Sequence, residues 1–243
     1  MLAGLAAGGI NAVVGSGTLV TFPVLLGAGL PPVLANVTNT TGLVPGSVAA
    51  AVGYRAELRG RWPRVAGLAG ASALGGGTGA ALLLVLPDRA FRLVVPVLIA
   101  LACVLVLLQP RIAAALGAGA GHPDHERTTL LLLGVFLSGI YGGYFGAAQG
   151  VLLLAVLGAT MDERLQVLNG VKNVLAGVVN AVAALFFVLA TDIYWRAAGL
   201  VAVGAVVGGV LGARVGRRLP DALLRGFVVV VGVLAIGQIV ATW

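Results

Sequence analysis

The residues best suited to bind a ligand in this chain are amides and hydroxyls that interrupt two long apolar runs. The first interruption holds Asn11, Gly15, Ser16, Gly17 and Thr18, and the second, between residues 141 and 149, holds Gly146 and Gln149. A helix that begins at such an interruption presents free N–H groups and the positive end of its dipole, which favours an anion. Glycines alone would also allow two helices to pack closely. The hydroxyl and amide groups among them favour a binding site.

A second set of polar residues follows each interruption. The first set lies at residues 36–41 and includes Thr38 and Asn39, and the second includes Asn169, Lys172 and Asn173. An amide in hydrocarbon is costly unless it is hydrogen-bonded, so polar residues at matching places favour one shared pocket. We expect Asn39 to correspond to Asn173 in the second half of the chain.

Lys172 is the only lysine and the only charge well inside an apolar run. The nearest carboxylates in sequence, Asp162 and Glu163, lie at the start of the same run. An unpaired ammonium in hydrocarbon is costly, so we predict an anionic substrate as its partner. The alternative is that Lys172 lies nearer the interface and extends its ammonium to water.

The composition excludes a soluble protein. Only 9% of the residues are charged and 60% are hydrophobic, whereas about 25% are charged in a soluble domain. The net charge of +7 comes from arginines at the ends of apolar runs, without the basic face that nucleic acid would require. The single cysteine, Cys103, excludes an internal disulfide and a thiolate metal site. We predict a protein surrounded by the lipid bilayer, with no nucleic-acid partner, no metal and no cofactor.

Eight apolar runs approach the roughly 20 residues of a membrane-spanning helix. They occupy residues 2–28, 32–54, 63–86, 90–109, 129–158, 163–190, 194–213 and 222–242. Backbone polar groups in hydrocarbon must be paired within the segment, so these runs are predicted to be helices despite their many valines and glycines. The predicted fold class is an all-α integral membrane protein.

The second half of the chain repeats the first. Residues 62–107 align without a gap on residues 195–240, and the aligned residues share a glycine cluster and a Leu-Pro-Asp-x-x-x-Arg turn. The glycines Gly75, Gly76 and Gly79 align with Gly208, Gly209 and Gly212. Duplicated halves in an apolar chain are typical of secondary transporters, whose substrate site lies where the two copies meet. We predict two repeats of four segments each.

The arginines indicate how the repeats are oriented. If all eight runs cross the membrane, the arginines divide evenly between its two sides. If the first and fifth runs are re-entrant, one side keeps only Arg89, Arg92 and Arg196, and all the other arginines lie on the opposite side. The second arrangement satisfies the positive-inside rule. Each repeat then crosses three times, which makes the repeats inverted; a continuous but kinked helix is the alternative.

The predicted organisation is an N-terminal membrane repeat at residues 1–109, an extramembrane linker at 110–128 and a C-terminal membrane repeat at 129–243. The linker holds both histidines, His122 and His125. Their spacing resembles that of metal ligands, but no third ligand cluster accompanies them. We interpret them as solvated loop residues.

The first copy resembles the TauE/SafE family of sulfite and organosulfonate exporters. The resemblance rests on the stretch 8–23, on Gly29-Leu30-Pro31-Pro32 and on Ala35-Asn36-Val37-Thr38-Asn39, and it extends over essentially the whole chain. Gly15, Gly17, Pro23, Thr38 and Asn39 match the family motif. The chain departs from the motif at Ser16, at Thr18 and at residues 147–149, where further glycines are common. The resemblance implies a multi-pass permease of the bacterial inner membrane for small sulfur-containing or carboxylated anions, coupled to the proton gradient.

The predicted function is therefore secondary transport of a small anion, such as sulfite or a sulfonate, by alternating access between the repeats. No Asp, Glu or His lies inside an apolar run, so proton coupling has little support from the residues themselves, and the oligomeric state is open. A membrane enzyme acting on lipid phosphates would need clustered acids, bases or metal ligands, and the acidic residues are scattered. An accessory subunit without transport would not need the polar interruptions.

Overall fold

The computed structural model describes residues 1–117, 125–215, 226, 229–234 and 236–237. The helices are α1 (Leu2–Val13), α2 (Thr18–Gly27), α3 (Pro32–Gly53), α4 (Trp62–Val85), α5 (Asp88–Gly117), α6 (His125–Tyr144), α7 (Gln149–Thr160), α8 (Leu165–Ala190) and α9 (Trp195–Val215). Within these residues all the regular structure is helical, as predicted. The eighth expected run, 222–242, lies mostly outside the described residues, and the positions of it that are described are helical.

The first and fifth apolar runs are each broken into two helices. α1 ends at Val13 and α2 begins at Thr18, whereas α6 ends at Tyr144 and α7 begins at Gln149. Within the described residues, four stretches are long and apolar enough to cross a membrane: Trp62–Val85, Asp88–Leu108, Leu165–Ala190 and Trp195–Arg214. α3 has a similar length, 22 residues, and carries the polar cluster at residues 36–41.

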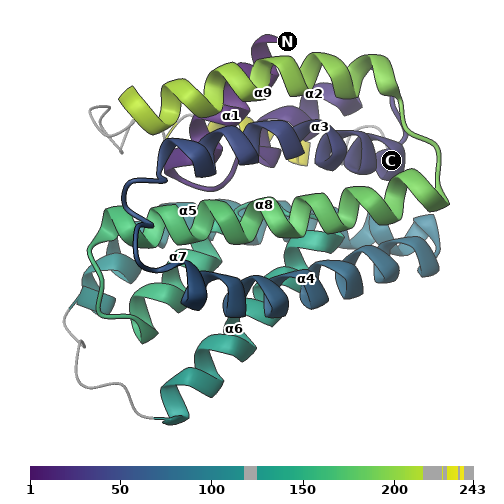
Figure 1. The fold of residues 1–243 in the computed structure, drawn as a ribbon. Helices are drawn as coiled ribbons and strands as arrows, with labels where there is room; N and C mark the ends of the chain where they lie inside the picture. The colour runs from purple at the N-terminus through teal and green to yellow at the C-terminus, as the bar shows by residue number, and fades with distance from the viewer. Residues whose placement is uncertain (118–124, 216–225, 227–228, 235, 238–243) are drawn as a thin grey trace.

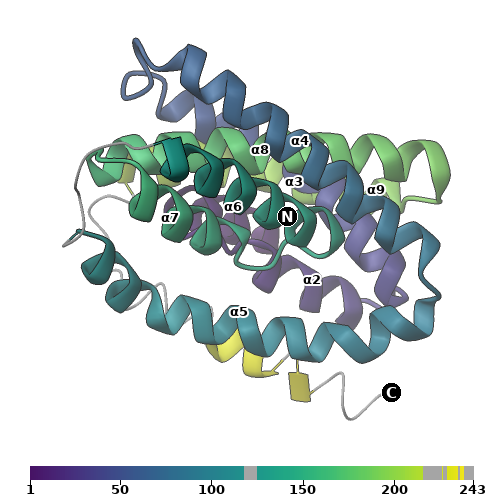
Figure 2. The ribbon, with the colours of Figure 1, turned by 90° about the horizontal axis from the view of Figure 1, so that it is seen from below.

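The helices form two layers (Figure 1). α1, α2, α3 and α9 lie in the upper layer, and α4, α6, α7 and α8 lie in the lower one, with α3 packed against α8 where the layers meet. Seen from below, α5 runs along one flank of the molecule beside α7 (Figure 2). The two broken runs therefore lie in different layers, and both face the boundary that α3 and α8 form.

Each broken run packs against a helix from the other half of the chain. α1 lies along α9, and α6 lies along α4. The repeated glycines make these contacts: a Cβ added to Gly79 would lie 2.1 Å from the carbonyl oxygen of Ile140, and one added to Gly208 would lie 2.0 Å from that of Leu5. Lipid provides no hydrophobic force between helices, so close backbone approach at small residues supplies the packing energy.

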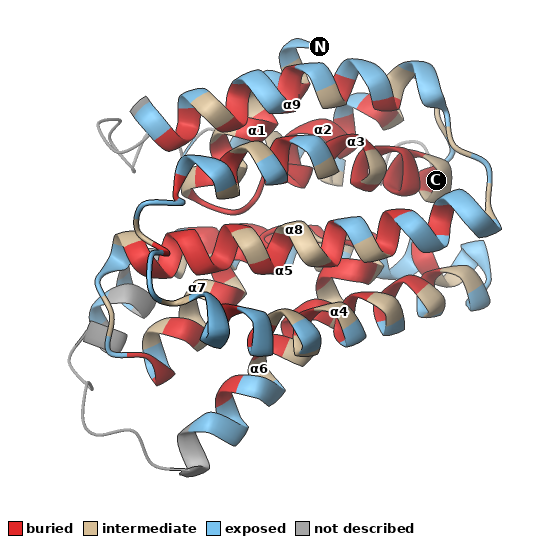
Figure 3. Ribbon diagram, in the orientation of Figure 1, coloured by how far each residue is buried: buried red, intermediate tan, exposed pale blue. Residues whose placement is uncertain are grey.

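Large apolar side chains cover the outside of the bundle. Val85 is 82% exposed and Leu189 is 77% exposed, while most of the polar residues of α3 and α8 are buried (Figure 3). Exposed apolar surface on this scale indicates a surface that faces lipid. Cys103 is buried in the core and is 6% exposed.

The stretch expected to be a loop between the halves is partly helical. α5 continues to Gly117 and α6 begins at His125, so both helices extend into the expected linker at 110–128. Residues 113–116 are Ala-Ala-Ala-Leu, which are strong helix formers and extend α5 beyond its apolar run. His122 lies outside the described residues, and His125 is the first residue of α6.

An ion pair connects the loop before α4 to the loop before α8. Arg61 donates to both carboxylate oxygens of Glu163, at 2.8 and 2.9 Å. Hydrogen bonding from Arg61 lowers the pKa of Glu163, so the pair stabilises the fold above the ordinary carboxyl pKa, and this contribution is lost as the pH falls through the lowered value. Two loops that are distant in sequence therefore lie at the same end of the bundle.

Candidate functional site

The two breaks touch each other near the centre of the molecule. The N–H of Gly150, in the first turn of α7, donates to the carbonyl oxygen of Gly15 at 3.0 Å. Gly15 and Gly146 have φ of 84° and 76°, a region that glycine reaches without strain. A Cβ on Gly15 would lie 2.4 Å from the Cα of Gly150. The backbones are in direct contact at this point, so a ligand must lie beside it.

Side chains of α8 bind the end of α1. The ammonium of Lys172 donates to the carbonyl oxygens of Asn11, Ala12 and Val13 at 3.3, 3.2 and 3.3 Å. Asn173 donates from Nδ2 to the same Ala12 oxygen at 3.1 Å. The last carbonyls of a helix have no partner within the helix, and they form the negative end of its dipole. Lys172 therefore neutralises the interrupted end of α1.

The start of α2 has a different partner, on α3. Asn39 donates from Nδ2 to Thr18 Oγ1 at 3.2 Å and accepts a hydrogen bond from Thr21 Oγ1. All three side chains are at least nine-tenths buried. A Cβ added to Gly146, in the second break, would lie 3.9 Å from Thr18 Oγ1. This polar network of the first repeat therefore adjoins the break of the second.

The end of α6 is held in a similar way to the end of α1. Asn36 on α3 donates from Nδ2 to the carbonyl oxygen of Tyr144 at 2.9 Å, and Tyr141 donates its hydroxyl hydrogen to the carbonyl oxygen of Ala147. Ala148 has φ of 58°, which is strained for a residue with a side chain. This strain falls within residues 147–149, one of the places where the chain departs from the motif that it resembles.

Several polar atoms at the breaks are buried without a partner in the described part of the chain. They are Ser16 Oγ, Gln149 Nε2, Asn36 Oδ1 and Asn169 Oδ1. A buried polar atom without a hydrogen bond costs about 1–3 kcal/mol, so these atoms require water or a ligand. Ser16 and Gln149 belong one to each break, and neither α2 nor α7 has a side-chain cap on its first turn. The first N–H groups of α7 and those of Leu19 and Val20 in α2 are bonded to backbone carbonyls, so the donors left for an anion are the side chains of Ser16 and Gln149.

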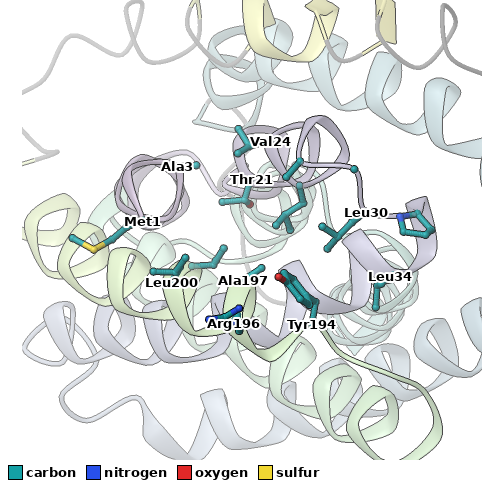
Figure 4. Close-up of a pocket in the computed structure, with 15 residues that line it drawn as sticks. Met1, Ala3, Thr21, Val24, Leu30, Leu34, Tyr194, Arg196, Ala197 and Leu200 are labelled. Carbon is teal, nitrogen blue, oxygen red and sulfur yellow. The ribbon is translucent and has the colours of Figure 1, made fainter.

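A cavity of about 750 Å³ reaches this network from one end of the bundle. Residues of α9, including Arg196, Ala197 and Leu200, lie across it from Thr21 and Val24 of α2 (Figure 4). Thr21 connects the cavity to the polar network, because it lines the cavity and also donates a hydrogen bond to Asn39. The Arg196 guanidinium would attract an anion to this opening.

Most of the predicted site residues gather at the breaks, but Thr38 does not. Its hydroxyl accepts a hydrogen bond from the N–H of Tyr194 at 3.2 Å, so Thr38 fastens α3 to the loop before α9. Adjacent residues on a helix point about 100° apart, and here Thr38 bonds the loop before α9 while Asn39 bonds the start of α2. Asn169 lies about one turn before Asn173, on the same face of α8.

The contacts change the expected correspondence between the repeats. A Cβ on Gly76 would meet Val179, and a Cβ on its repeat partner Gly209 would meet Gly46, so Gly46 and Val179 are equivalent. In this register Asn39 corresponds to Lys172, and Thr40, not Asn39, corresponds to Asn173. An amide in one repeat thus takes the place of an ammonium in the other.

The structure confirms that Lys172 lies well inside the bundle and excludes the alternative in which its ammonium reaches water. Lys172 is 0% exposed and does not extend to water. Glu163 pairs with Arg61, so it is not the partner of Lys172. The three carbonyl oxygens of α1 receive the ammonium hydrogens directly, and none of these acceptors could be inferred from sequence distance.

Sequence reasoning did not assign three residues to the site. Thr21 lies one turn after Thr18 on the same face of α2, a spacing that could have indicated it. Asn36 belongs to the polar set at residues 36–41 but was not named as a site residue, although it lies three residues before Asn39. Arg196 lies just after the start of an apolar run, and nothing in its sequence surroundings distinguishes it from the other arginines.

Comparisons with known proteins point to one family. The family model described as sulfite exporter TauE/SafE matches residues 1–239. A protein of Haemophilus influenzae named "Probable membrane transporter protein" is 27% identical over 246 residues, covering 98% of this chain and 91% of its own. "Probable membrane transporter protein YfcA" of Escherichia coli K12 is 25% identical over 230 residues, covering 93% and 82%. "Probable membrane transporter protein ORF9" of a Sinorhizobium species is 26% identical over 245 residues, covering 96% and 87%. No solved structure gives a significant match.

We predict that Gly15→Ala prevents the two breaks from meeting. The new Cβ would overlap Gly150 and would also have an unfavourable positive φ, for a combined cost above about 3 kcal/mol. Gly29→Ala is the matched control, because Gly29 has φ of 89° and nothing within 4 Å of an added Cβ. It should cost only about 1–2 kcal/mol. Thermal unfolding in detergent measures both, and equal losses would contradict a tight contact at Gly15.

Proposed function

Because the chain belongs to the TauE/SafE family, we propose that it is a secondary transporter that moves a small anion across the bacterial inner membrane. Its relatives carry names of membrane transporters, and its apolar helices make it a multi-pass membrane protein. The family description makes sulfite, or a chemically similar sulfonate, the first substrate to test. Small carboxylates share the charge and hydrogen-bonding capacity of these anions and are the second.

Two inverted repeats account best for how the broken runs enter the bundle. Met1 and Ala28 line the same cavity as Arg196, so α1 and α2 begin and end at one end of the bundle. Leu131 of α6 and Met161, just after α7, pack in one cluster with Leu58, near Arg61. The α6–α7 pair thus opens towards the opposite end. Two re-entrant pairs that enter from opposite ends are what inverted repeats require.

The arginines agree with this arrangement. Arg61 and Glu163 are paired, and Arg55, Arg59 and Arg214 line one cavity, so these residues lie at one end of the bundle. If all eight runs crossed the membrane, the loops carrying Arg61 and Glu163 would lie on opposite sides. The positive-inside rule then makes the arginine-rich end cytoplasmic.

The proposed substrate site lies beside the contact between Gly15 and Gly150. The observation that carries it is the pair of buried, unpartnered groups Ser16 Oγ and Gln149 Nε2, one at each half-helix start. Hydroxyl and amide donors, with the dipoles of α2 and α7, can bind the oxygens of a sulfite or sulfonate. The full proposed set also includes Asn11, Gly17, Thr18, Asn39, Gly146, Asn169, Lys172 and Asn173.

Lys172 contributes a positive charge to the proposed site and couples anion binding to movement of the re-entrant pair α1–α2. Its three ammonium hydrogens have three carbonyl acceptors, so an anion that bonds Lys172 must displace at least one of them. The displaced carbonyl belongs to the end of α1, which packs against α9. Anion binding would therefore loosen the re-entrant pair, as alternating access requires.

We expect purified protein in liposomes to take up radiolabelled sulfite or a small sulfonate, and Asn39→Ala combined with Asn173→Ala to abolish uptake. Both amides bond the interrupted backbone or the hydroxyls beside it. Asn180→Ala is the control, since Asn180 donates to Ser47 and makes no contact with the breaks among the bonds described. Undiminished uptake by the double variant would contradict the assignment of Asn39 and Asn173 to the substrate pocket. Failure of the protein to transport any of the anions offered would exclude sulfite and small sulfonates as substrates.

We expect Lys172→Met to weaken anion affinity by at least about tenfold and to lower stability by about 3–5 kcal/mol, because three carbonyls lose a buried charged donor. The substrate-induced rise in melting temperature reports affinity separately from the baseline stability. Lys172→Arg keeps the charge and should retain part of the rise. If the Met variant keeps the wild-type rise, Lys172 has only a structural role.

Single cysteines introduced at Ala56, Arg214 and Asp192, in a Cys103→Ala background, test the orientation. All three positions are exposed. A membrane-impermeant maleimide should label Ala56→Cys and Arg214→Cys only from the cytoplasmic side, and Asp192→Cys only from the other. Labelling of Ala56→Cys and Arg214→Cys from opposite sides would reject the inverted arrangement. The transport proposal is tested separately by uptake into liposomes.

A further inference from the structure

A second cavity, of about 330 Å³, lies at the arginine-rich end of the bundle. The ends of α3 and α9 and the start of the following loop enclose it, and Arg55, Arg59 and Arg214 line it. Its other lining residues are Ala49, Val52, Gly53, Ala56 and Val210. The lining therefore combines three guanidinium groups with small and apolar side chains and contains no carboxylate.

The three guanidinium groups have no acidic partner among the described residues. The ion pair described nearby joins Arg61 to Glu163, and the hydrogen bond described for Arg55 goes to the backbone oxygen of Val52 at 3.4 Å. Three like charges around one cavity repel each other unless an anion lies between them. None of the residues that line the cavity belongs to the two breaks, so it is separate from the proposed substrate site.

The cavity also lies where a bilayer places its headgroups. Arg214 is the last residue of the candidate span Trp195–Arg214. On the bilayer side of the cavity, Val48 and Val52 of α3 are 54% and 51% exposed, and Leu211 of α9 is 47% exposed. A phosphate at the arginines would thus continue into acyl chains along these side chains. A free phosphate ion would leave this apolar surface unused.

We propose that the cavity lined by Arg55, Arg59 and Arg214 binds the headgroup of an anionic phospholipid. Guanidinium groups form paired hydrogen bonds with phosphate oxygens, and basic pockets between membrane helices select anionic headgroups. The bound lipid would hold the ends of α3 and α9 together. These two helices together hold α1, so the lipid would stabilise the layer that contains the first break.

The test compares the full-length protein with two triple variants. The cavity variant removes the three charges of the cavity and combines Arg55→Gln, Arg59→Gln and Arg214→Gln. The control variant removes three charges elsewhere at the same end and combines Arg64→Gln, Arg111→Gln and Arg164→Gln. Native mass spectrometry counts retained phosphatidylglycerol against phosphatidylcholine, and thermal unfolding measures the stabilisation. Wild type and the control variant should retain phosphatidylglycerol and gain stability from it, and the cavity variant should bind it at least about tenfold more weakly.

Three outcomes would overturn the proposal. Equal losses in both triple variants would mean that only the overall charge attracts the lipid. Equal retention of phosphatidylcholine would mean that the acyl chains alone are recognised. A stabilisation reproduced by inorganic phosphate in lipid-free detergent would assign the cavity to a free anion. If the cavity variant fails to fold, the single change Arg214→Gln, with Arg164→Gln as its control, is measured in the same two ways.

Discussion

The structure depends on the requirement that every backbone polar group within hydrocarbon has a partner. Two helices end inside the bundle, and their last carbonyls face a region without bulk water. Lys172 and Asn173 bond those of α1, and Asn36 bonds that of α6 at Tyr144. Because α3 and α8 supply these donors, they form the centre of the fold, and their polar residues are structural supports as well as candidate ligands.

The repeats share a backbone plan but differ in chemistry at one decisive position. Asn39 and Lys172 are equivalent, yet the amide bonds the start of α2 whereas the ammonium bonds the end of α1. One repeat therefore stabilises a half-helix start with neutral groups, and the other stabilises a half-helix end with a full charge. Because only the second repeat contributes a charge, the two repeats would bind an anion in the proposed site with unequal strength. Such a difference suits a transporter that binds its substrate on one side of the membrane and releases it on the other.

The sequence alone predicted the helices and the breaks, because glycine pairs and arginine distribution are local signals with direct physical meaning. It could not predict the acceptors of Lys172, because a charged partner was expected, and the actual partners are backbone dipoles from α1, far away in the chain. Thr38 was assigned to the pocket because it belongs to the polar set at residues 36–41 and matches the family motif, but its hydroxyl accepts a hydrogen bond from Tyr194. The loop expected between the halves is shorter than residues 110–128. The alanines at 113–115 extend α5 into this stretch, although its glycines and histidines are typical of a loop.

The first helix of each half packs against a helix of the other half, α1 against α9 and α6 against α4. This pairing has a consequence for how the protein is made. α1 packs against α9, which is synthesised long after it. During most of translation α1 and its break must wait beside the translocon or in lipid with the carbonyls at its end unmet. A chain that stopped before α9 would still have Lys172 and Asn173 to bond the end of α1, but it would lack the helix against which α1 packs.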